Sequence, residues 1–471
     1  MFYQSCNLLT NRGSYYLNVK GGVMERYDYI IVGGGPASRI LNKYIHFFHK
    51  GVKTAIIREE ERIVNHCGTP YIVEGEIPWE KGLIKEEIVT RWGTPIIIDR
   101  VIDGNTEEKY VICESGKKYG YDRLIFATGT DQIIPDIEGK DLKNILKVRK
   151  TVDLKETIKA LGNLKKIVVL GAGYIGLEFA VSLMRMGKEV TVVELMPHVL
   201  GGRLDKKIIE MVEEHLKEMG ITLLTGERAV KFTGKERVEG VLLESGKVIE
   251  TDAVLSAVGV RPLVDYAEKF GLKTSKNGII VNEYFETGVK DVYAIGDCIE
   301  TKHFITGKPY PGKLGSNAGQ MARILGLNLG GIKRPYEGVI NATITKVGEI
   351  AIGSAGLSEK DAMEQGIDVI TGYGESTCMY ANMPGHRKVF VKVMYKKDNL
   401  QFIGTEIVGK FNPAGFVETA TQLILMKAKL YDVIGYHYSS HPELTPKTSH
   451  PYFAFASEDV LKKLISENRI P

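Results

Sequence analysis

The feature that most constrains the fold is a unit of strand, glycine turn, helix and strand that occurs twice. The first copy reads YIIVGGGPASRILNKYIHFF from Tyr29 and closes with VKTAIIREE. The second copy reads KKIVVLGAGYIGLEFAVSLMRMGKEVTVVEL. Each copy has the pattern of a βαβ unit, in which two parallel strands are joined by a helix. Two such units predict two nucleotide-binding domains built on parallel sheets.

The segments that follow these units extend the duplication. From Pro95 to Leu124, Asp-Gly and Ser-Gly turns predict a β-meander, and a return strand, LIFATGT, comes next. The stretch from Glu227 to Pro262 repeats this meander and return. From about Tyr336, alternating strands lead to an amphipathic helix, FVETATQLILMK, which predicts a separate domain. We therefore expect an α/β fold with two Rossmann-like domains and a C-terminal α+β domain.

The expected domain boundaries follow from these changes of pattern. Residues 1–23 lack periodicity and also lack the apolar core of a signal peptide, so we expect a poorly ordered extension there. The first domain is expected over residues 24–150 and 275–335, the second over 151–274 and the third over 336–471.

The composition narrows the class of protein. With 62 basic and 58 acidic residues, the formal charge of +4 is too balanced for a nucleic-acid surface. No apolar run reaches the roughly 18 residues that span a bilayer, so we expect no membrane partner. The cysteines lack the spacing of a metal site or of a disulfide framework, which indicates a reducing cytoplasm. They are Cys6, Cys67, Cys113, Cys298 and Cys378.

The first glycine turn, from Gly33 to Ser38, predicts a phosphate site. A strand turns there into a helix, whose unpaired N–H groups and positive dipole end attract a pyrophosphate. A carboxylate about 20 residues further on, Glu59 with Glu60 as the rival, suits ribose hydroxyls. A purely structural glycine turn is the alternative. The binding candidates of the turn are Gly33 and Gly35, then Pro36 and Ala37, and Ser38 in place of a third glycine.

The second glycine turn carries all three glycines of the dinucleotide pattern, Gly171, Gly173 and Gly176. Glu194 closes the following strand, where its carboxylate can accept hydrogen bonds from both ribose hydroxyls of an adenosine. Because that carboxylate repels a 2′-phosphate, the sequence favours NADH over NADPH. Arg203 lies further along the chain and is a cation that would soften this preference.

From about Glu25 to His450, five motifs in order resemble the flavin-dependent pyridine nucleotide disulfide oxidoreductases. GGGPAS resembles their FAD phosphate loop and GAGYIGLE their NAD loop, while ATGT and AVGVRP resemble the two return strands. AIGDC resembles the second FAD contact, in which Asp297 would hydrogen-bond the ribityl chain or the phosphate region. Tyr174 and Glu178 would lie near the nicotinamide, with helix packing as the alternative. The contacts that the resemblance adds are Ala127, Thr128, Gly129, Tyr174, Ile175, Glu178, Gly259, Gly296 and Asp297.

The reactive segment resembles the single-cysteine branch of this family, which includes coenzyme A disulfide reductase and NADH oxidase. The segment reads NHCGTPYI, and Ile72 stands where two-cysteine members carry their second cysteine. The resemblance implies that the thiol of Cys67 cycles between a thiolate and a mixed disulfide or sulfenic acid. We expect a helix N-terminus and His66 to stabilise the thiolate, and the other cysteines to serve packing.

Two further residues resemble catalytic positions of the family. His441, in SSHPELTP, resembles the acid–base histidine that the partner subunit supplies in two-cysteine enzymes, although Pro446 replaces their glutamate. A histidine in ordinary packing is the alternative for His441. Tyr380, in MYANMPG, lies where coenzyme A disulfide reductases place a substrate-facing tyrosine.

The resemblance implies a cytoplasmic, homodimeric FAD enzyme that passes electrons from NADH, or from NADPH, through Cys67 to a disulfide or polysulfide. Coenzyme A disulfide is the favoured substrate. The alternatives are an NADH oxidase that reduces O2, a dihydrolipoamide dehydrogenase-like protein without its second redox cysteine, and a non-catalytic flavin redox sensor. The basic residues of the first helix would meet coenzyme A phosphates if they share an open face, and are otherwise a solvated face. They are Arg39, Lys43, His46 and Lys50.

Overall fold

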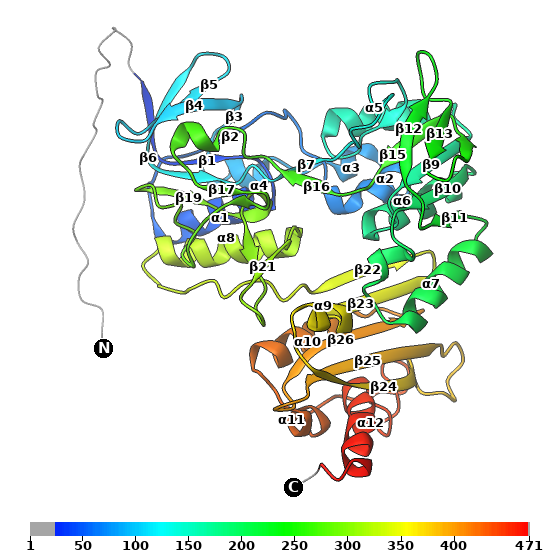
Figure 1. Ribbon diagram of the computed structural model, residues 1–471. Coiled ribbons are helices and arrows are strands. Elements are labelled where there is room, and N and C mark those ends of the chain that lie inside the picture. Colours follow the sequence, from blue (N-terminus) through cyan, green and yellow to red (C-terminus); the bar gives the residue numbers. More distant parts are fainter. Residues whose placement is uncertain (1–23, 470–471) are drawn as a thin grey trace, which may run out of the picture.

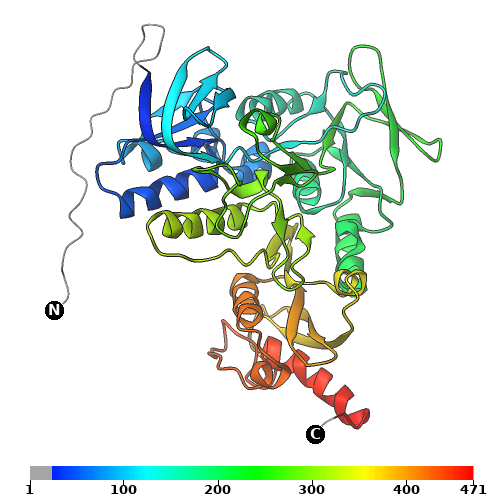
Figure 2. The same cartoon turned by 60° about the vertical axis from the view of Figure 1, so that its left-hand side comes forward.

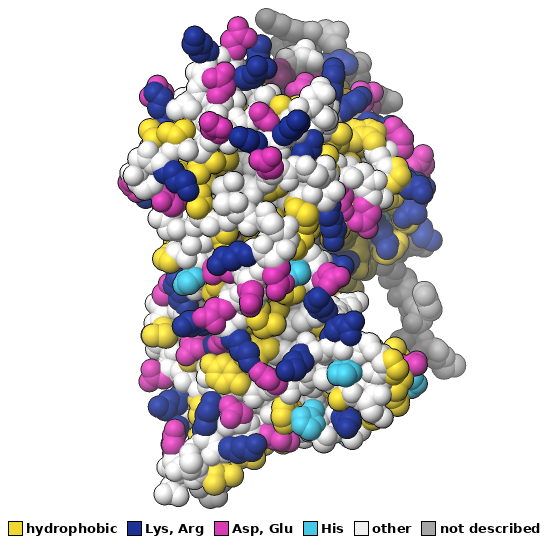
Figure 3. Space-filling view, turned by 90° about the vertical axis from the view of Figure 1, so that its right-hand side faces the viewer, with side chains coloured by type: hydrophobic (Ala, Val, Ile, Leu, Met, Phe, Trp, Pro, Cys, Tyr) yellow, Lys and Arg dark blue, Asp and Glu magenta, His cyan; other side chains and the backbone are white. Residues whose placement is uncertain are grey.

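The computed structural model describes residues 24–469, and the extension expected over residues 1–23 lies outside them. Figure 1 shows three units: a first α/β unit in blue and cyan, a second in green, and a third in yellow to red beneath them. On the face that Figure 3 shows, basic and acidic side chains are interspersed. The expected fold class, with two Rossmann-like units and a C-terminal α+β unit, is confirmed.

The first unit is built on a seven-stranded sheet in the order β3-β2-β1-β6-β5-β4, with β19 paired to β6. The strands β3, β2, β1, β6 and β19 run parallel, and the second half of β1 is apolar and buried, with Ile30 and Ile31 fully buried. Helices α1 and α8 pack side by side on one face (Figure 2). The bounds are β1 Glu25–Val32, α1 Pro36–Phe48, β2 Thr54–Arg58, β3 Ile96–Ile98, β4 Val101–Asn105, β5 Tyr110–Cys113, β6 Lys118–Phe126, β19 Val292–Ala294 and α8 Gly315–Leu329.

The turn expected at Asp103-Gly104 is wrong, because both residues lie within β4. A Cβ at Gly104 would lie 2.4 Å from the ring of Phe270, so the glycine lets that ring pack against the strand. The chain turns later, where the Asn105 side chain accepts hydrogen bonds from the N–H groups of residues 107 and 108. The Ser-Gly turn is confirmed, with Gly116 at φ +83°.

The second unit has an all-parallel sheet in the order β11-β10-β9-β15-β8 and a β-meander, β12-β13-β14. Strand β8 already belongs to this sheet, a few residues ahead of the expected boundary. A ribbon of β7 (Thr130–Gln132) and β16 (Val260–Pro262) joins the two units. The bounds are β8 Ile145–Leu146, α5 Thr151–Leu161, β9 Lys166–Leu170, α6 Tyr174–Arg185, β10 Glu189–Glu194, α7 Lys206–Glu218, β11 Thr222–Thr225, β12 Ala229–Thr233, β13 Gly240–Leu243, β14 Val248–Glu250 and β15 Ala253–Ser256.

The third unit is a five-stranded antiparallel sheet in the order β22-β23-β26-β25-β24, with α10 and α12 packed against it. The expected amphipathic helix is α10. Strand β24 and helix α12 were not anticipated from the sequence. The bounds are β22 Thr343–Val347, β23 Ile350–Gly356, α9 Glu359–Glu364, β24 Val369–Thr377, β25 Lys388–Lys396, β26 Phe402–Gly409, α10 Ala414–Leu425, α11 Leu430–Ile434 and α12 Tyr452–Ser466.

A buried ion cluster fixes the second unit on the third. Lys392, which is 2% exposed, places its Nζ 3.0 Å from Asp205 Oδ2 and 2.5 Å from Glu359 Oε2. Asp205 caps α7, and its own N–H donates to Glu406 Oε2 at 2.6 Å. Burial raises the pKa of Glu406 to about 7, although Lys392 opposes the rise. The cluster therefore holds a carboxyl group that titrates near neutral pH.

Glu406 makes the free energy of unfolding depend on pH. Its pKa is about 7 in the folded chain against the ordinary 4.5, so the folded chain keeps a proton that the unfolded chain releases. Stability therefore falls as the pH rises through this window. We expect the stability of Glu406→Gln relative to the wild type to rise by about 2 to 3 kcal/mol between about pH 5 and about pH 8, measured by urea unfolding. Glu418→Gln, on the exposed side of α10, is the control. If the difference in free energy of unfolding between Glu406→Gln and the wild type is the same at every pH, Glu406 does not cause the pH dependence.

Candidate active site

A cavity of about 1630 Å³ opens where the first and second units meet, and it continues to the third unit. Small-molecule sites commonly measure about 300 to 1,000 Å³, so this cavity has room for more than one ligand. Its walls include the first glycine turn, the segment of Cys67, the return strand with Ala127, Thr128 and Gly129, and the loop of Gly296 and Asp297. The sequence motifs expected around one cofactor therefore line one cavity.

The first glycine turn forms a cradle at the start of α1. Gly33 has φ +111°, and a Cβ there would lie 2.2 Å from the carbonyl oxygen of Ala127, so only glycine fits. At Gly35, the N-cap of α1, a Cβ would meet no atom within 4 Å, which leaves open space for a phosphate. Pro36 begins the helix and, with Ala37, lines the cavity. These features fit a dinucleotide phosphate group.

Ser38 marks where the two glycine turns differ. In the second turn, a Cβ at Gly176 would lie 2.0 Å from the carbonyl oxygen of Gly171, so glycine is required for close packing. Ser38 is fully buried behind the first turn, and its hydroxyl has no hydrogen-bond partner among the described residues. The first turn therefore accommodates a side chain that the second turn excludes.

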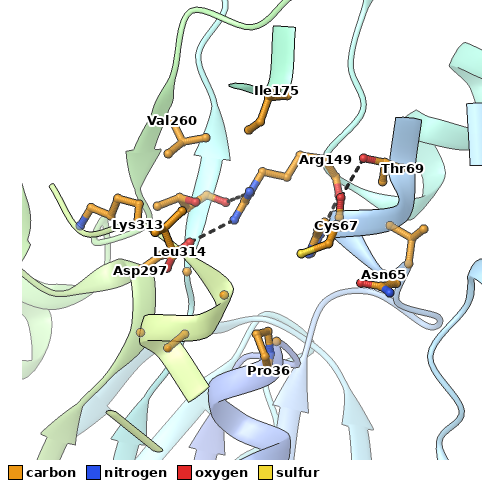
Figure 4. Close-up of a pocket in the computed structure, with 18 of the residues that line it drawn as sticks. Pro36, Asn65, Cys67, Thr69, Arg149, Ile175, Val260, Asp297, Lys313 and Leu314 are labelled. Carbon is orange, nitrogen blue, oxygen red and sulfur yellow. Dashed lines mark hydrogen bonds and ion pairs between the residues drawn. The ribbon is translucent and has the colours of Figure 1, made fainter. Parts of the chain in front are cut away.

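Cys67 lies in a short 3-10 turn, His66–Gly68, that runs into α2 (Thr69–Val73). Its side chain is exposed and points into the cavity, on the opposite wall from Asp297 (Figure 4). His66, which was expected to stabilise the Cys67 thiolate, precedes it in this turn. Burial lowers the pKa of His66 to about 4, and its Nε2–H donates to the carbonyl oxygen of Arg149 at 2.9 Å. The ring is therefore neutral at pH 7 and fixes the position of the turn.

The opposite wall carries a buried charged group. Burial raises the pKa of Asp297, while Arg149 and Lys313 oppose this. Arg149 Nη2 lies 3.7 Å from Asp297 Oδ2, and Arg149 Nε donates to the carbonyl oxygen of Thr130 at 2.6 Å. Within residues 24–469, neither carboxylate oxygen of Asp297 accepts a hydrogen bond. Both oxygens are thus free for hydroxyl donors of a ligand, as the ribityl role requires.

Arg149 and Lys313 were missed by the sequence analysis. Arg149 follows β8 in a connecting segment without any motif, so no signal marked it. Lys313 lies just ahead of α8, and its Nζ donates to the carbonyl oxygens of Asn277 and Ile299 at 2.6 and 2.8 Å. Burial lowers the pKa of Lys313. A lysine beside a glycine-punctuated helix was the available signal.

Glu59 also lines the cavity, next to the end of β2. Its carboxylate is 3.2 Å from Lys150 Nζ and 3.5 Å from Arg100 Nε, and it is about half exposed. The rival carboxylate, Glu60, accepts a hydrogen bond from the N–H of Thr151 at 2.6 Å. Glu59 therefore pairs with partly exposed side chains, whereas Glu60 is bound to the backbone, and this difference favours Glu59 for a ribose.

The second glycine turn is organised around Glu194, which is 9% exposed. Its carboxylate accepts hydrogen bonds from the N–H groups of Ala172 at 2.6 Å and Met196 at 2.8 Å. Gly171 has φ +96°, and Gly173 is the N-cap of α6. The three glycines of the turn lie outside the lining of the large cavity, whereas Gly259 lines it.

Tyr174, Ile175 and Glu178, on α6, line the cavity close to the third unit. Thr345 on β22 donates to Glu178 Oε1 at 2.7 Å, and Thr343 donates to the hydroxyl of Tyr174 at 3.3 Å. Burial raises the pKa of Glu178. The start of α6 is thus held by β22, so the third unit shapes this end of the cavity.

Tyr380 and His441 come together on the third unit, away from the cavity lining. The N–H of Tyr380 donates to the carbonyl oxygen of Pro442, and its hydroxyl is paired with that of Ser440, both at 2.9 Å. His441 is exposed. The two residues predicted from the sequence therefore share one surface. Within one chain, that surface lies away from the cavity of Cys67.

Two other basic groups differ from expectation. Arg203 pairs with Asp361 and Glu364 of α9, so it does not extend freely beside the second glycine turn. The basic residues of α1 share no open face: Arg39 lines the cavity, whereas Lys43 lies on a separate surface pocket with Trp92. Nε2 of His46 is within hydrogen-bond distance of the hydroxyls of Thr54 and Thr94.

Residues 27–322 match the pyridine nucleotide-disulphide oxidoreductase family, and residues 343–450 match the dimerisation domain of that family. The chain belongs to this family. The expected resemblance and the expectation of an oxidoreductase that uses a pyridine nucleotide are therefore confirmed. Across the described part of the chain, no helix is long and apolar enough to cross a membrane, and no cluster of His, Cys, Asp or Glu could hold a metal ion.

Several members of the family are similar over most of their length. An NADH oxidase of Methanocaldococcus jannaschii is 32% identical over 92% of this chain and 99% of its own. An NAD(P)H sulfur oxidoreductase (CoA-dependent) of Pyrococcus furiosus is 31% identical over 82% of this chain and 89% of its own. The structure of an NAD-dependent persulfide reductase from A. fulgidus is 26% identical and covers 93% of this chain and 84% of its own, with a TM-score of 0.88.

Proposed function

We propose that this chain forms a homodimeric, FAD-dependent reductase that passes two electrons from NADH through Cys67 to a disulfide, persulfide or polysulfide. Coenzyme A disulfide is the favoured substrate. The observation that carries the proposal is the exposed thiol of Cys67 on the wall of the cavity that also holds the first glycine turn and Asp297. With a disulfide RSSR, the reaction is NADH + H⁺ + RSSR → NAD⁺ + 2 RSH, which balances electrons and protons.

The residues present fit FAD. The cradle of Gly33 and Gly35 would receive the pyrophosphate, Glu59 a ribose, and Asp297 the ribityl hydroxyls, with Arg149 and Lys313 as nearby cations. When bound, FAD would accept a hydride from NADH and supply two electrons to sulfur. In the second unit, Gly171, Gly173 and Gly176 would receive NADH, and the carboxylate of Glu194 would favour it over NADPH.

Cys67 carries the substrate step of the proposal. Its thiolate attacks one sulfur of the disulfide, so a Cys67–substrate S–S bond forms, the original S–S bond breaks, and the departing thiolate takes a proton. Two electrons that originate in NADH then break the new bond and restore the Cys67 thiolate. Among the cysteines of residues 24–469, Cys113 and Cys298 are fully buried and Cys378 lies in the third unit. In this part of the chain no second thiol therefore adjoins Cys67, which supports a single-cysteine cycle.

A dimer would complete the site. The third unit matches a dimerisation domain and exposes large apolar side chains, with Met426 76% and Leu444 75% exposed. Because Tyr380 and His441 lie on this unit, away from the cavity, they would serve Cys67 of the other subunit. The partner subunit's His441 would then give the proton to the departing thiolate.

NADH oxidase activity is the second candidate, because the M. jannaschii relative carries that name. Consumption of NADH without air separates the two functions. A disulfide reductase oxidises NADH anaerobically only when coenzyme A disulfide or polysulfide is added, and it releases two thiols for each NADH with the disulfide. An oxidase consumes NADH in air without a disulfide and is idle without O2. A redox sensor consumes NADH steadily under neither condition. Either the behaviour of an oxidase or the behaviour of a sensor would contradict the proposal.

A further inference from the structure

Arg203 emerges directly beside the second glycine turn. Residues 195–205 follow β10, and within them the 3-10 turn Val199–Gly202 brings the chain back, with Leu200, Gly201 and Gly202 at φ values of 55, 66 and 60°. The N–H of Leu200 donates to the carbonyl oxygen of Ala172 at 2.9 Å, which ties this loop to the glycine turn. Arg203 directly follows the 3-10 turn, and its N–H donates to the carbonyl oxygen of Leu200 at 3.4 Å, so its backbone is held close to the glycine turn.

The third unit binds the guanidinium of Arg203. Arg203 pairs with Asp361, and its Nη1 lies 3.6 Å from Glu364 Oε2, both on α9. Asp361 is itself fixed, because its Oδ2 accepts the hydroxyl of Ser358 at 2.8 Å and its N–H donates to Ser358 Oγ at 3.0 Å. The Asp361 side chain is 10% exposed, whereas that of Arg203 is 50% exposed. The carboxylate is thus a rigid anchor and the arginine is the part that can move.

The other cations of this region are also paired. His198 lies 3.3 Å from Glu213, Lys206 lies 3.5 Å from Glu210, and Lys207 pairs with Glu375 of β24. Glu194 adds a carboxylate at the end of β10. A carboxylate thus closes β10, and the basic side chains that follow it along the chain pair with neighbouring carboxylates. A ribose 2′-phosphate carries about two negative charges and needs a cation there.

We propose that Asp361 and Glu364 determine the coenzyme specificity of this protein by withholding Arg203 from the ribose 2′-phosphate of NADPH. This inference rests on the proposed use of a pyridine nucleotide by the second unit. The contact links specificity to the third unit, because the two carboxylates that restrain Arg203 belong to α9 and not to the nucleotide-binding sheet. Arg203 itself is a specificity-determining residue that acts only when it is released.

The test is the double variant Asp361→Asn/Glu364→Gln, which keeps the shape of both side chains and removes both charges. We expect the ratio of kcat/KM for NADPH to that for NADH to rise about tenfold, since a charge-assisted hydrogen bond is worth at least one factor of ten. Adding Arg203→Ala to this background should cancel the gain. Calorimetric binding of 2′,5′-ADP and of 5′-AMP gives a second readout without turnover, and only 2′,5′-ADP should bind more tightly.

Glu375→Gln is the matched control, because it frees Lys207 from a similar contact between the second and third units. We expect it to leave the NADPH to NADH ratio unchanged. An equal gain would show that the loss of any nearby negative charge raises the ratio, and it would contradict the proposed role of Asp361 and Glu364. Arg203→Met in the wild-type background is a second test, which does not depend on the folding of the double variant. It should leave the ratio unchanged, and a loss of NADPH use would show that Arg203 already binds the phosphate.

Failure of this inference is distinct from failure of the proposed function. If disulfide reduction is absent but 2′,5′-ADP binding follows Arg203 as described, the substrate assignment is wrong and the specificity contact stands. If disulfides are reduced with NADH but the double variant leaves both readouts unchanged, the contact is wrong and the reductase stands.

Discussion

Cys67→Ser is expected to lower the rate of NADH-driven disulfide reduction by about 10³-fold or more, because a serine hydroxyl is neither a thiolate at neutral pH nor able to form a disulfide. The substitution changes one atom of an exposed side chain, so the cavity keeps its shape. Bound flavin and the binding of NADH should remain as in the wild type. Anaerobic steady-state kinetics with coenzyme A disulfide, together with flavin absorbance, measure both properties.

The matched control for this change is Cys378→Ser. Cys378 is the other described cysteine that is not buried, and its sulfur accepts a hydrogen bond from the N–H of Arg387 at 3.3 Å on the third unit. Its replacement should leave turnover within about twofold of the wild type, as for most substitutions outside a site. A Cys67→Ser enzyme that retains a tenth of the wild-type disulfide turnover would exclude Cys67 as the nucleophile.

Asp297→Ala is expected to weaken FAD binding about 10- to 100-fold, since a hydrogen bond to a charged group is worth about 1.5 to 3 kcal/mol. Burial raises the pKa of Asp297, and the positive charges of Arg149 and Lys313 oppose this rise. Removal of the carboxylate also leaves Arg149 without its acidic partner in the cavity. The ratio of flavin to protein after gel filtration, and titration of the apoprotein with FAD, measure the loss.

Asp297→Asn should retain part of this affinity, because the amide oxygen still accepts a hydrogen bond without the charge. Asp136→Ala is the control, since the side chain of Asp136 is 90% exposed and lies on the surface beside Lys140. The binding of 5′-AMP to the second unit should be unaffected in all three variants. Normal flavin content in Asp297→Ala would remove this residue from the FAD site.

The parts of the fold that the sequence predicts are those governed by local pattern. The two glycine turns, their flanking strands and the return strands have strong local signals, because only glycine adopts φ +111° at Gly33 and +96° at Gly171. The Asp103-Gly104 turn was mispredicted for a tertiary reason, namely that Gly104 makes room for Phe270. Here packing from a distant segment overrode a local turn signal.

The parts of the site that the sequence could not predict depend on contacts between units. Arg149 meets His66 and Asp297 only after the chain has folded, and neither spacing nor composition marks it. The pKa of His66 could not be predicted from the sequence, because burial and the neighbouring Arg149, and not the residue type, lower it. In the same way, the pairing of Arg203 with Asp361 joins residues 158 positions apart. Local motifs therefore mark the candidate nucleotide sites, whereas contacts between distant residues set the pKa values and the ion pairs of the charged groups.

In the proposed reaction, the sulfur of Cys67 carries the substrate. The most direct measurement stops the anaerobic reaction with coenzyme A disulfide by acid, before and after NADH is added, and locates adducts by mass spectrometry of peptides. Substrate transfer through Cys67 predicts one substrate thiol bound to Cys67 in each chain before NADH and free Cys67 afterwards. Steady disulfide reduction with Cys67 unmodified throughout, or an adduct that NADH does not remove, would contradict it.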